Sequence, residues 1–331
     1  KPHSFRFIMR NVILNRRKGM NKMQKKNLKG NVLLLFAAAI WGFAFVAQRV
    51  GVTHIGSYTF TALRFALGAL SLLPVIFITS KKAENPQKNN FSKKEELKSV
   101  IKSGTIAGIV LFSAVILQQV GLEDTTAGKA AFITGFYIIL VPAFGVFFKQ
   151  RVNAKTWVAS ILAILGMYFL SVNENFYIAK GDLLVFGCSF FFAAHILLIN
   201  KYTCYVDTLK MSFVQYIVCS AISFLCAVAF EDINILNIQK AAVPILYGGF
   251  FSVGVAYTLQ AYGQKYAKAS HAAIIMSLES VFAVIGGALL LKESMSLRGY
   301  LGCLFMLAGV IVSQYVGKSG EISKTGTDLA N

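Results

Sequence analysis

A few polar side chains lie inside long apolar stretches of this chain, and these residues could do chemistry. Glu279 stands about nine residues inside such a stretch, hence about 13 Å from the end of a helix. A charge at the centre of a membrane costs roughly 2.5 to 3.5 kcal/mol on insertion scales. A carboxyl group at that depth could bind and release a proton during a functional cycle, or face a cationic group of a ligand. A protonated Glu279 bonded to a neighbouring helix is an equally good interpretation.

Other polar and aromatic residues could line a cavity together with Glu279. Gln118 and Gln260 offer amide donors and acceptors without the full cost of a buried ion. Their alternative role is hydrogen bonding between helices. Aromatic stripes more often serve packing, and a lone histidine is more often a satisfied polar group. The remaining candidates for the cavity wall are Trp41, Gln48, Tyr137, His195 and Tyr257.

Three basic residues are candidates for entrance or gating roles. Arg64 lies about seven residues into its segment, where its side chain could cap carbonyl groups or pair with Glu279 or another acid. Lys129 and His271 each precede Tyr137 and Glu279 by eight residues, which puts them about 12 Å away along the same helical face. We therefore expect entrance groups, although Lys129 could equally reach the lipid headgroups.

The elements that must position these residues are membrane-spanning helices. The chain has 331 residues, of which 56% are hydrophobic and only 14% charged, too few to cover a soluble globule. Its apolar blocks have the length of about 20 residues that a helix needs to cross a bilayer, and the alternating polarity of a β-barrel is missing. The composition predicts an all-α polytopic membrane protein with ten spans at 31–49, 57–79, 99–120, 128–148, 154–171, 182–200, 210–230, 242–263, 270–291 and 297–316.

A formal net charge of +19 could indicate nucleic-acid binding, but the charged residues lie in the loops and tails of a membrane protein, so we predict no nucleic-acid partner. Lysines gather in alternate loops, which predicts that both termini lie in the cytoplasm of a plasma membrane, the inner membrane in bacteria. The loop with Lys292 and Arg298 does not follow this pattern, because it would lie outside the cell. The five cysteines lack metal-binding spacing, so we predict neither a metal nor a cofactor.

The tails lie outside the spans. Residues 1–29 form a basic tail, and residues 317–331 follow the last span. Met20 and Met23 stand just ahead of the first span, so residues 1–19 could be an artefact of translation upstream of the native start. The stretch from Phe5 to Leu14 is interrupted by arginines and lacks a small-residue cleavage site, unlike a signal peptide.

The chain resembles itself at a nearly constant offset. The segment from Gly30 to Trp41 resembles that from Gly181 to Phe192, and the same offset aligns Arg64 with Gln215. Further along, Gln118 aligns with Gln260, Lys129 with His271, and Tyr137 with Glu279. The repeats would cover 30–172 and 181–316 with about five spans each, and an odd number inverts the second repeat in the membrane. Chance similarity between Ala, Gly and Leu-rich helices is the alternative.

Several segments also resemble the EamA family of the drug/metabolite transporter superfamily. These are Trp41-Gly-Phe-Ala-Phe45, Leu63-Arg-Phe65, the stretch from Phe132 to Pro142, and Leu278-Glu-Ser-Val-Phe282 with Leu291-Lys-Glu293. The resemblance implies two five-helix repeats of opposite topology, with helices one, three, four, six, eight and nine around a central cavity. Ser280 stands where the family usually has proline, which puts the kink expected there in doubt.

The function that fits best is a permease for a small metabolite, such as an amino acid or a related amphipathic compound, working by alternating access. Export follows from the resemblance alone, and protons could be the coupling ion. An intramembrane enzyme would need a reactive cluster, and a channel would need a filter or charge ring; the sequence has neither. A scaffold would not explain Glu279 or the repeat. Substrate, direction, coupling and the choice between monomer and homodimer stay open.

Overall fold

The structure is a computed structural model that describes residues 2–82, 93–147, 152–171, 179–291 and 297–327. These residues are helical and contain no β-strand. The first half contains α1 (Pro2–Gly51), α2 (Ser57–Lys82), α3 (Lys93–Asp124), α4 (Ala127–Thr134), α5 (Tyr137–Phe147) and α6 (Ala154–Ser171). The second half contains α7 (Lys180–Tyr202), α8 (Thr208–Phe230), α9 (Ile235–Lys240), α10 (Ala242–Leu246), the π-helix η1 (Tyr247–Tyr257), α11 (Thr258–Gln264), α12 (Ala269–Met276), α13 (Glu279–Leu291) and α14 (Leu297–Thr327).

Eight segments of the described chain are long and apolar enough to cross a membrane, as predicted. They lie in α1, α2, α3, α4 with α5, α7, α8, α10 through α11, and α12 with α13. The apolar helices Ala154–Phe169 and Leu297–Ser313 coincide with the other two predicted spans but are shorter, so their crossing stays a prediction. The charged loop positions 83–92, 148–151, 172–178 and 292–296, including Lys292, lie outside the described residues.

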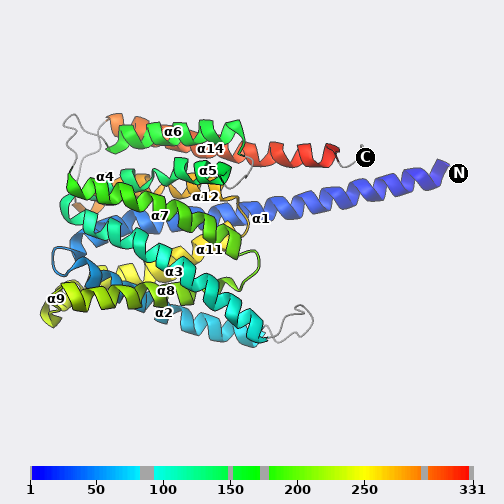
Figure 1. The fold of residues 1–331 in the computed structure, drawn as a ribbon. Coiled ribbons are helices and arrows are strands. Elements are labelled where there is room, and N and C mark those ends of the chain that lie inside the picture. The colour runs from blue at the N-terminus through cyan, green and yellow to red at the C-terminus, as the bar shows by residue number, and fades with distance from the viewer. Residues whose placement is uncertain (1, 83–92, 148–151, 172–178, 292–296, 328–331) are drawn as a thin grey trace.

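The helices form one bundle with α1 running through its middle. Helices α6 and α14 pack together at one edge, and α2 packs on α8 at the other (Figure 1). Between them, α1 packs against α13, η1 and α11, and α3 packs against α7 and α8. We call the end from which α1 and α14 project the terminal end (Figure 1). It also holds the turns after α7 and α11; the opposite end holds the turns after α1, α3 and α8.

Two of the long segments are broken in the middle. A turn at 135–136 separates α4 from α5, and a turn at 277–278 separates α12 from α13, so that Tyr137 and Glu279 each begin the second piece. The backbone tightens there, because the amide of Leu278 bonds to the carbonyl of Ile275 at 3.2 Å. The helix is therefore interrupted close to the position where the resemblance implies a kink, and the interruption precedes Ser280. Ser280 Oγ donates to the carbonyl of Ala131, 3.2 Å away.

A π-helix replaces the α-helix in the seventh of these long segments, between α10 and α11. A π-helix bonds each amide to the carbonyl five residues earlier, and such segments often occur at functional sites. It is here that α1 comes close, because Trp41 Nε1 donates to the carbonyl of Ser252 at 3.3 Å. The irregular stretch thus holds Ser252 and Tyr257 beside the centre of the bundle.

Gly42 allows α1 to pack against the start of α13, and this contact gives a prediction. A Cβ added at Gly42 would lie 2.3 Å from Phe282 Cβ and 2.7 Å from the carbonyl oxygen of Glu279. Backbone atoms cannot move aside cheaply, so we expect Gly42→Ala to destabilise the protein by about 1 to 3 kcal/mol. Thermal unfolding in detergent would measure the loss as a lower Tm.

The matched control for this substitution is Gly187→Ala on α7. An added Cβ there meets only a Leu117 methyl group at 3.7 Å, an ordinary contact. Alanine is the better helix former, so this variant should keep or slightly raise the Tm. Equal effects of the two substitutions would show that the close approach at Gly42 is not a tight contact.

Candidate functional site

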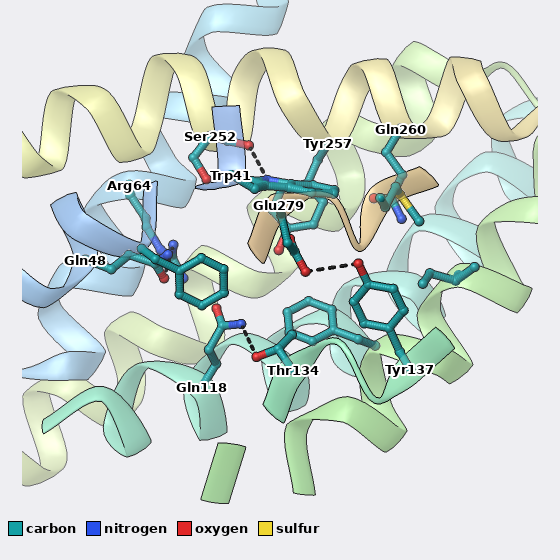
Figure 2. Close-up of a pocket in the computed structure, with 14 residues that line it drawn as sticks. Trp41, Gln48, Arg64, Gln118, Thr134, Tyr137, Ser252, Tyr257, Gln260 and Glu279 are labelled. Carbon is teal, nitrogen blue, oxygen red and sulfur yellow. Dashed lines mark hydrogen bonds between the residues drawn. The ribbon is translucent and has the colours of Figure 1, made fainter. Parts of the chain in front are cut away.

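A cavity at the centre of the bundle gathers polar residues from several spans (Figure 2). The space there that no atom occupies amounts to about 470 Å³, part of which is open to the outside. Its apolar wall contains Phe45, Phe192, Ile196 and Met276, and its aromatic wall contains Trp41 and Tyr257. The polar groups come from six spans and are Gln48, Arg64, Gln118, Thr134, Tyr137, Ser252, Gln260 and Glu279.

Glu279 and Tyr137 meet at the centre of this cavity. The Tyr137 hydroxyl donates to Glu279 Oε1 at 3.0 Å, and the Glu279 side chain is only 5% exposed. In Figure 2, Arg64 and Gln48 lie on one side of Glu279, and Tyr137 and Gln260 on the other. The two helix breaks put these residues there, since each is the first residue after its break. Glu279 forms no ion pair with a described residue.

Arg64 lines the cavity, so its entrance or gating role stays a prediction. Among the described residues it pairs with no acid, which was one of the two partners that the sequence offered. Its Nη1 donates to the amide oxygen of Gln48 at 2.9 Å, and its guanidinium lies over the rings of Phe60 and Phe65. Nε and Nη2 have no hydrogen-bond partner among the described residues, and the residue is 2% exposed. A buried guanidinium without a carboxylate can accept an anionic group from a ligand.

The glutamines differ in how they are held. Gln118 donates to the hydroxyl of Thr134 at 3.0 Å, so its amide is oriented by the protein. Gln260 is 3% exposed and faces the cavity, but no described residue bonds its amide (Figure 2). A buried amide facing a cavity without a protein partner can bind a ligand there.

The aromatic wall is a contact between α1 and η1. The rings of Trp41 and Tyr257 meet edge to face, with 4.8 Å between their centroids. His195, which the sequence suggested for the cavity wall, lies behind Tyr257 with 6.2 Å between the ring centroids and does not line the cavity. Its Nε2 instead bonds to Gln215 Oε1, 3.1 Å away.

Lys129 and His271 lie near opposite ends of the bundle and outside the cavity. Lys129 Nζ forms an ion pair with Asp182. His271 bonds through Nδ1 to Ser313 Oγ and through Nε2 to Asn31 Oδ1, the latter at 3.2 Å. Both therefore join helices, and an entrance role for either stays a prediction.

Sequence reasoning missed several residues of the cavity. Thr134 and Ser252 carry hydroxyl or backbone groups at its wall. Serine and threonine within a span commonly bond to their own helix, so nothing in the sequence distinguished these two from others. The apolar members Phe192, Ile196 and Met276 carried no signal either, because apolar residues fill every span.

Comparison with known proteins places this architecture in a family. The sequence model of the EamA-like transporter family matches residues 28–172 and 179–315. An uncharacterized transporter of Archaeoglobus fulgidus is 31% identical over 292 residues, 87% of this chain and 86% of that protein. The uncharacterized transporter YoaV of Bacillus subtilis is 22% identical over 288 residues, 85% of this chain and 95% of that protein.

A crystal structure shares the fold. It aligns with a TM-score of 0.71 over 88% of this chain and 98% of the other, at 15% sequence identity. The relatives are described as transporters, which points away from an enzyme. With the family matched across nearly the whole chain, and with eight segments long enough to span a bilayer, this protein is a multi-pass membrane protein that belongs to the EamA-like transporter family.

Proposed function

We propose that this protein is a secondary-active permease that carries a small metabolite across the membrane by binding it in the central cavity. The observation that carries the proposal is Arg64, a buried cation without an acidic partner, in one cavity with the carboxyl group of Glu279. Such groups cost free energy in the middle of a membrane protein and are usually functional. A ligand that completes their contacts would offset that cost.

The chemistry of the wall supports an amphipathic ligand such as an amino acid. The Nε and Nη2 atoms of Arg64 suit a carboxylate or a similar anionic group. Glu279 suits an amine or another donor, and the Gln260 amide suits either a donor or an acceptor. The edge-to-face pair of Trp41 and Tyr257 offers an apolar surface to the body of the ligand.

Ten spans in two inverted repeats are part of the proposal, and equivalent contacts support them. Gly30 on α1 crosses Gly263 on α11, and the aligned Gly181 on α7 crosses Gly121 on α3. In both crossings a Cβ on either glycine would lie within 3.0 Å of the carbonyl oxygen of the other. Small residues allow such close approach of membrane helices. The same contact thus occurs once in each half.

The cavity itself supports a pseudo-two-fold axis. Tyr137 and Glu279 are aligned positions, each follows the break of its own span, and they bond to each other. Positions that a two-fold axis exchanges can touch only where the axis passes between them. Discontinuous helices around a site near the midplane are a recurring feature of inverted-repeat transporters. Alternating access would then exchange the conformations of the two halves around Glu279.

Orientation and coupling complete the proposal. Helices α2 and α7 end, and α3 and α8 begin, at the terminal end with lysines near those helix ends, and we assign this end to the cytoplasm of a plasma membrane. Export and proton coupling through Glu279 are the remaining expectations. Lys129 with Asp182 at the opposite end and His271 with Asn31 at the terminal end are aligned contacts, which supports a role at the two entrances.

Uptake and efflux of a radiolabelled amino-acid panel in proteoliposomes test this function, together with Gln260→Ala. Since the net contribution of one neutral hydrogen bond is about 1 kcal/mol, we expect that variant to raise the half-saturating concentration about fivefold. Gln239→Ala, at an exposed position on α9, is the matched control and should behave as wild type. Absence of saturable flux from folded protein for every compound would contradict the substrate class.

A further inference from the structure

Buried polar atoms without hydrogen-bond partners are concentrated in two groups of this bundle. A protein seldom leaves such atoms unsatisfied, because each costs about 1 to 3 kcal/mol. Among the described residues, all of them except Arg298 Nε belong to the segments around α2 and α8. The atoms are Thr61 Oγ1, Arg64 Nε and Nη2, Gln119 Oε1, His195 Nδ1, Thr208 Oγ1, Ser212 Oγ, Gln215 Nε2 and Gln264 Oε1.

The first group runs inward from the terminal end, and we call it the terminal-end file. Thr208, Ser212 and Gln215 follow helical spacing along one face of α8, which begins at that end. Gln215 Oε1 bonds to His195 on α7, and Gln264 lies at the end of α11. Each of these five residues is at least nine-tenths buried and has one unsatisfied polar atom.

The second group runs inward from the opposite end, and we call it the opposite-end file. Ser57, Thr61 and Arg64 follow the same spacing along α2, which begins at that end. Arg64 bonds to Gln48 on α1, and Gln119 on α3 donates to the backbone carbonyl of Gln48 at 3.4 Å. All five are buried, and Thr61, Arg64 and Gln119 hold its unsatisfied atoms.

The two files are aligned in the internal repeat. The offset that sets Arg64 against Gln215 also sets Ser57 against Thr208 and Thr61 against Ser212. The supporting residues come from α1 and α3 in one file and from α7 and α11 in the other, which are equivalent helices. The polar stripe is thus a property of each half, and it leads from one end of the bundle to the middle.

Water can satisfy these atoms where lipid and protein do not. A buried water typically makes two to four hydrogen bonds to polar groups that would otherwise be unsatisfied. The opposite-end file reaches the cavity, because Arg64 and Gln48 line it. The terminal-end file ends at His195, whose ring contacts that of the cavity residue Tyr257 with 6.2 Å between the centroids. A file of water in each stripe would connect the cavity to one end of the bundle.

The charges of the two files differ at their inner ends and not at their mouths. Asp207 precedes Thr208 at one mouth, and Glu123 accepts a bond from Ser57 at the other. The inner end carries a permanent cation, Arg64, in one file and no permanent charge in the other. A fixed arginine repels protons and other cations in narrow polar pores. Further charged groups near the mouths include Glu96 with Lys210 at one end, and Arg49 and Glu231 at the other.

We propose that the two stripes hold files of water, and that the terminal-end file admits protons and small cations to the cavity wall while Arg64 bars them from the opposite-end file. The role of the terminal-end file as a path for the coupling ion rests on the proposed transport function. The hydration and the ion selectivity of the two files do not rest on that function. The proposal therefore predicts two properties that can be measured without any transported substrate.

Hydration is tested on the native protein in proteoliposomes by X-ray hydroxyl-radical footprinting, in which bound water gives radicals that oxidise adjacent side chains. We expect His195 and the neighbouring Tyr216 to be oxidised although both are buried. Met167 and Met306, which are fully buried between other helices and are easily oxidised, should stay unmodified. Protection of His195 and Tyr216 equal to that of the two methionines would overturn the hydrated files.

Selectivity is tested with the silver ion, a small cation that reacts with thiols, on variants whose five native cysteines are replaced. Ser212→Cys and Thr61→Cys put a thiol at aligned positions of the two files. Because Arg64 also favours the reactive thiolate at Thr61→Cys, each silver rate is divided by the rate with a small neutral thiol reagent on the same variant, which depends on the thiolate in the same way. Coulomb repulsion from a charge about one helical turn away, at an effective dielectric constant of about 20, should make this rate ratio about a hundredfold lower at Thr61→Cys than at Ser212→Cys. Adding Arg64→Gln to Thr61→Cys should remove most of that difference.

The control is Ala107→Cys. Ala107 is a fully buried residue of α3 that belongs to an apolar cluster with Met211 of α8 and Ala261 of α11. Since neither file reaches Ala107, the thiol of this variant should react with silver only at the slow rate of a buried thiol that water does not contact. Equal ratios of silver rate to neutral-reagent rate at the two file positions would overturn the barrier at Arg64, and no reaction at Ser212→Cys would overturn the terminal-end file. Either failure leaves the transport proposal standing, just as absent transport would leave hydrated files standing.

Discussion

Replacement of Arg64 by glutamine is expected to weaken the apparent affinity for an anionic or zwitterionic substrate about a hundredfold. Removing one partner of a buried, hydrogen-bonded charge pair costs about 2 to 5 kcal/mol, and about 3 kcal/mol corresponds to that factor. Arg64 has two unsatisfied N–H groups at the cavity, so a bound carboxylate would depend on it. Concentration dependence of uptake into proteoliposomes measures the effect.

The fold should tolerate this substitution. Glutamine is the residue at the aligned position of the second half, Gln215, and the change removes a buried charge. Arg64→Lys keeps the charge but loses the planar fork, so its affinity should lie between those of the wild type and the glutamine variant. Arg49→Gln is the matched control, because Arg49 donates to the carbonyls of Leu122 and Glu123 at the opposite end, outside the cavity. Wild-type affinity in Arg64→Gln, with intact Tm, would remove Arg64 from the binding site.

Replacement of Glu279 by glutamine is expected to abolish accumulation driven by a pH gradient while leaving exchange of substrate across the membrane. One pH unit stores about 1.4 kcal/mol per proton, which can concentrate the substrate about tenfold. For proton-coupled export, substrate gathers in the more acidic compartment, because each proton that leaves is exchanged for a substrate molecule that enters. Glutamine can still accept the bond from Tyr137 but cannot carry the proton. The accumulation ratio should therefore fall from about 10 to about 1.

Glu231→Gln is the matched control for the carboxylate. Glu231 accepts bonds from the amides of Tyr58 and Thr59 at 2.8 Å and from the Thr59 hydroxyl at 2.7 Å, where it caps α2 outside the cavity. We expect this variant to accumulate substrate as the wild type does, with a lower Tm. A Glu279→Gln variant that still concentrates substrate in a pH gradient would exclude Glu279 as the proton carrier and leave its bond to Tyr137 as its role.

Several residues of the cavity were predictable from the sequence, because the cost of polar groups in lipid makes each of them conspicuous. Glu279 was selected on its depth within a span, Gln118 and Gln260 were selected as amides at matched positions of the repeat, and all three line the cavity. Depth follows from a rise of 1.5 Å per residue and needs no knowledge of neighbouring helices. The family resemblance and the apolar blocks could likewise be read from the order of residues along the chain.

The direction in which a side chain points, and what it meets, was decided by tertiary packing. Arg64 and His195 have similar depth signals, yet Arg64 reaches the cavity and His195 lies behind Tyr257, because neighbouring helices determine which face is inward. The break before Glu279 was likewise not readable, since it occurs at Ser277 and Leu278 without proline. The order of apolar and polar residues was enough to predict the membrane class, the family and ten spans, of which eight are long enough in the described chain to cross a bilayer. Which polar residues share one cavity depends on contacts between helices far apart in the chain, so it became visible only in the folded bundle.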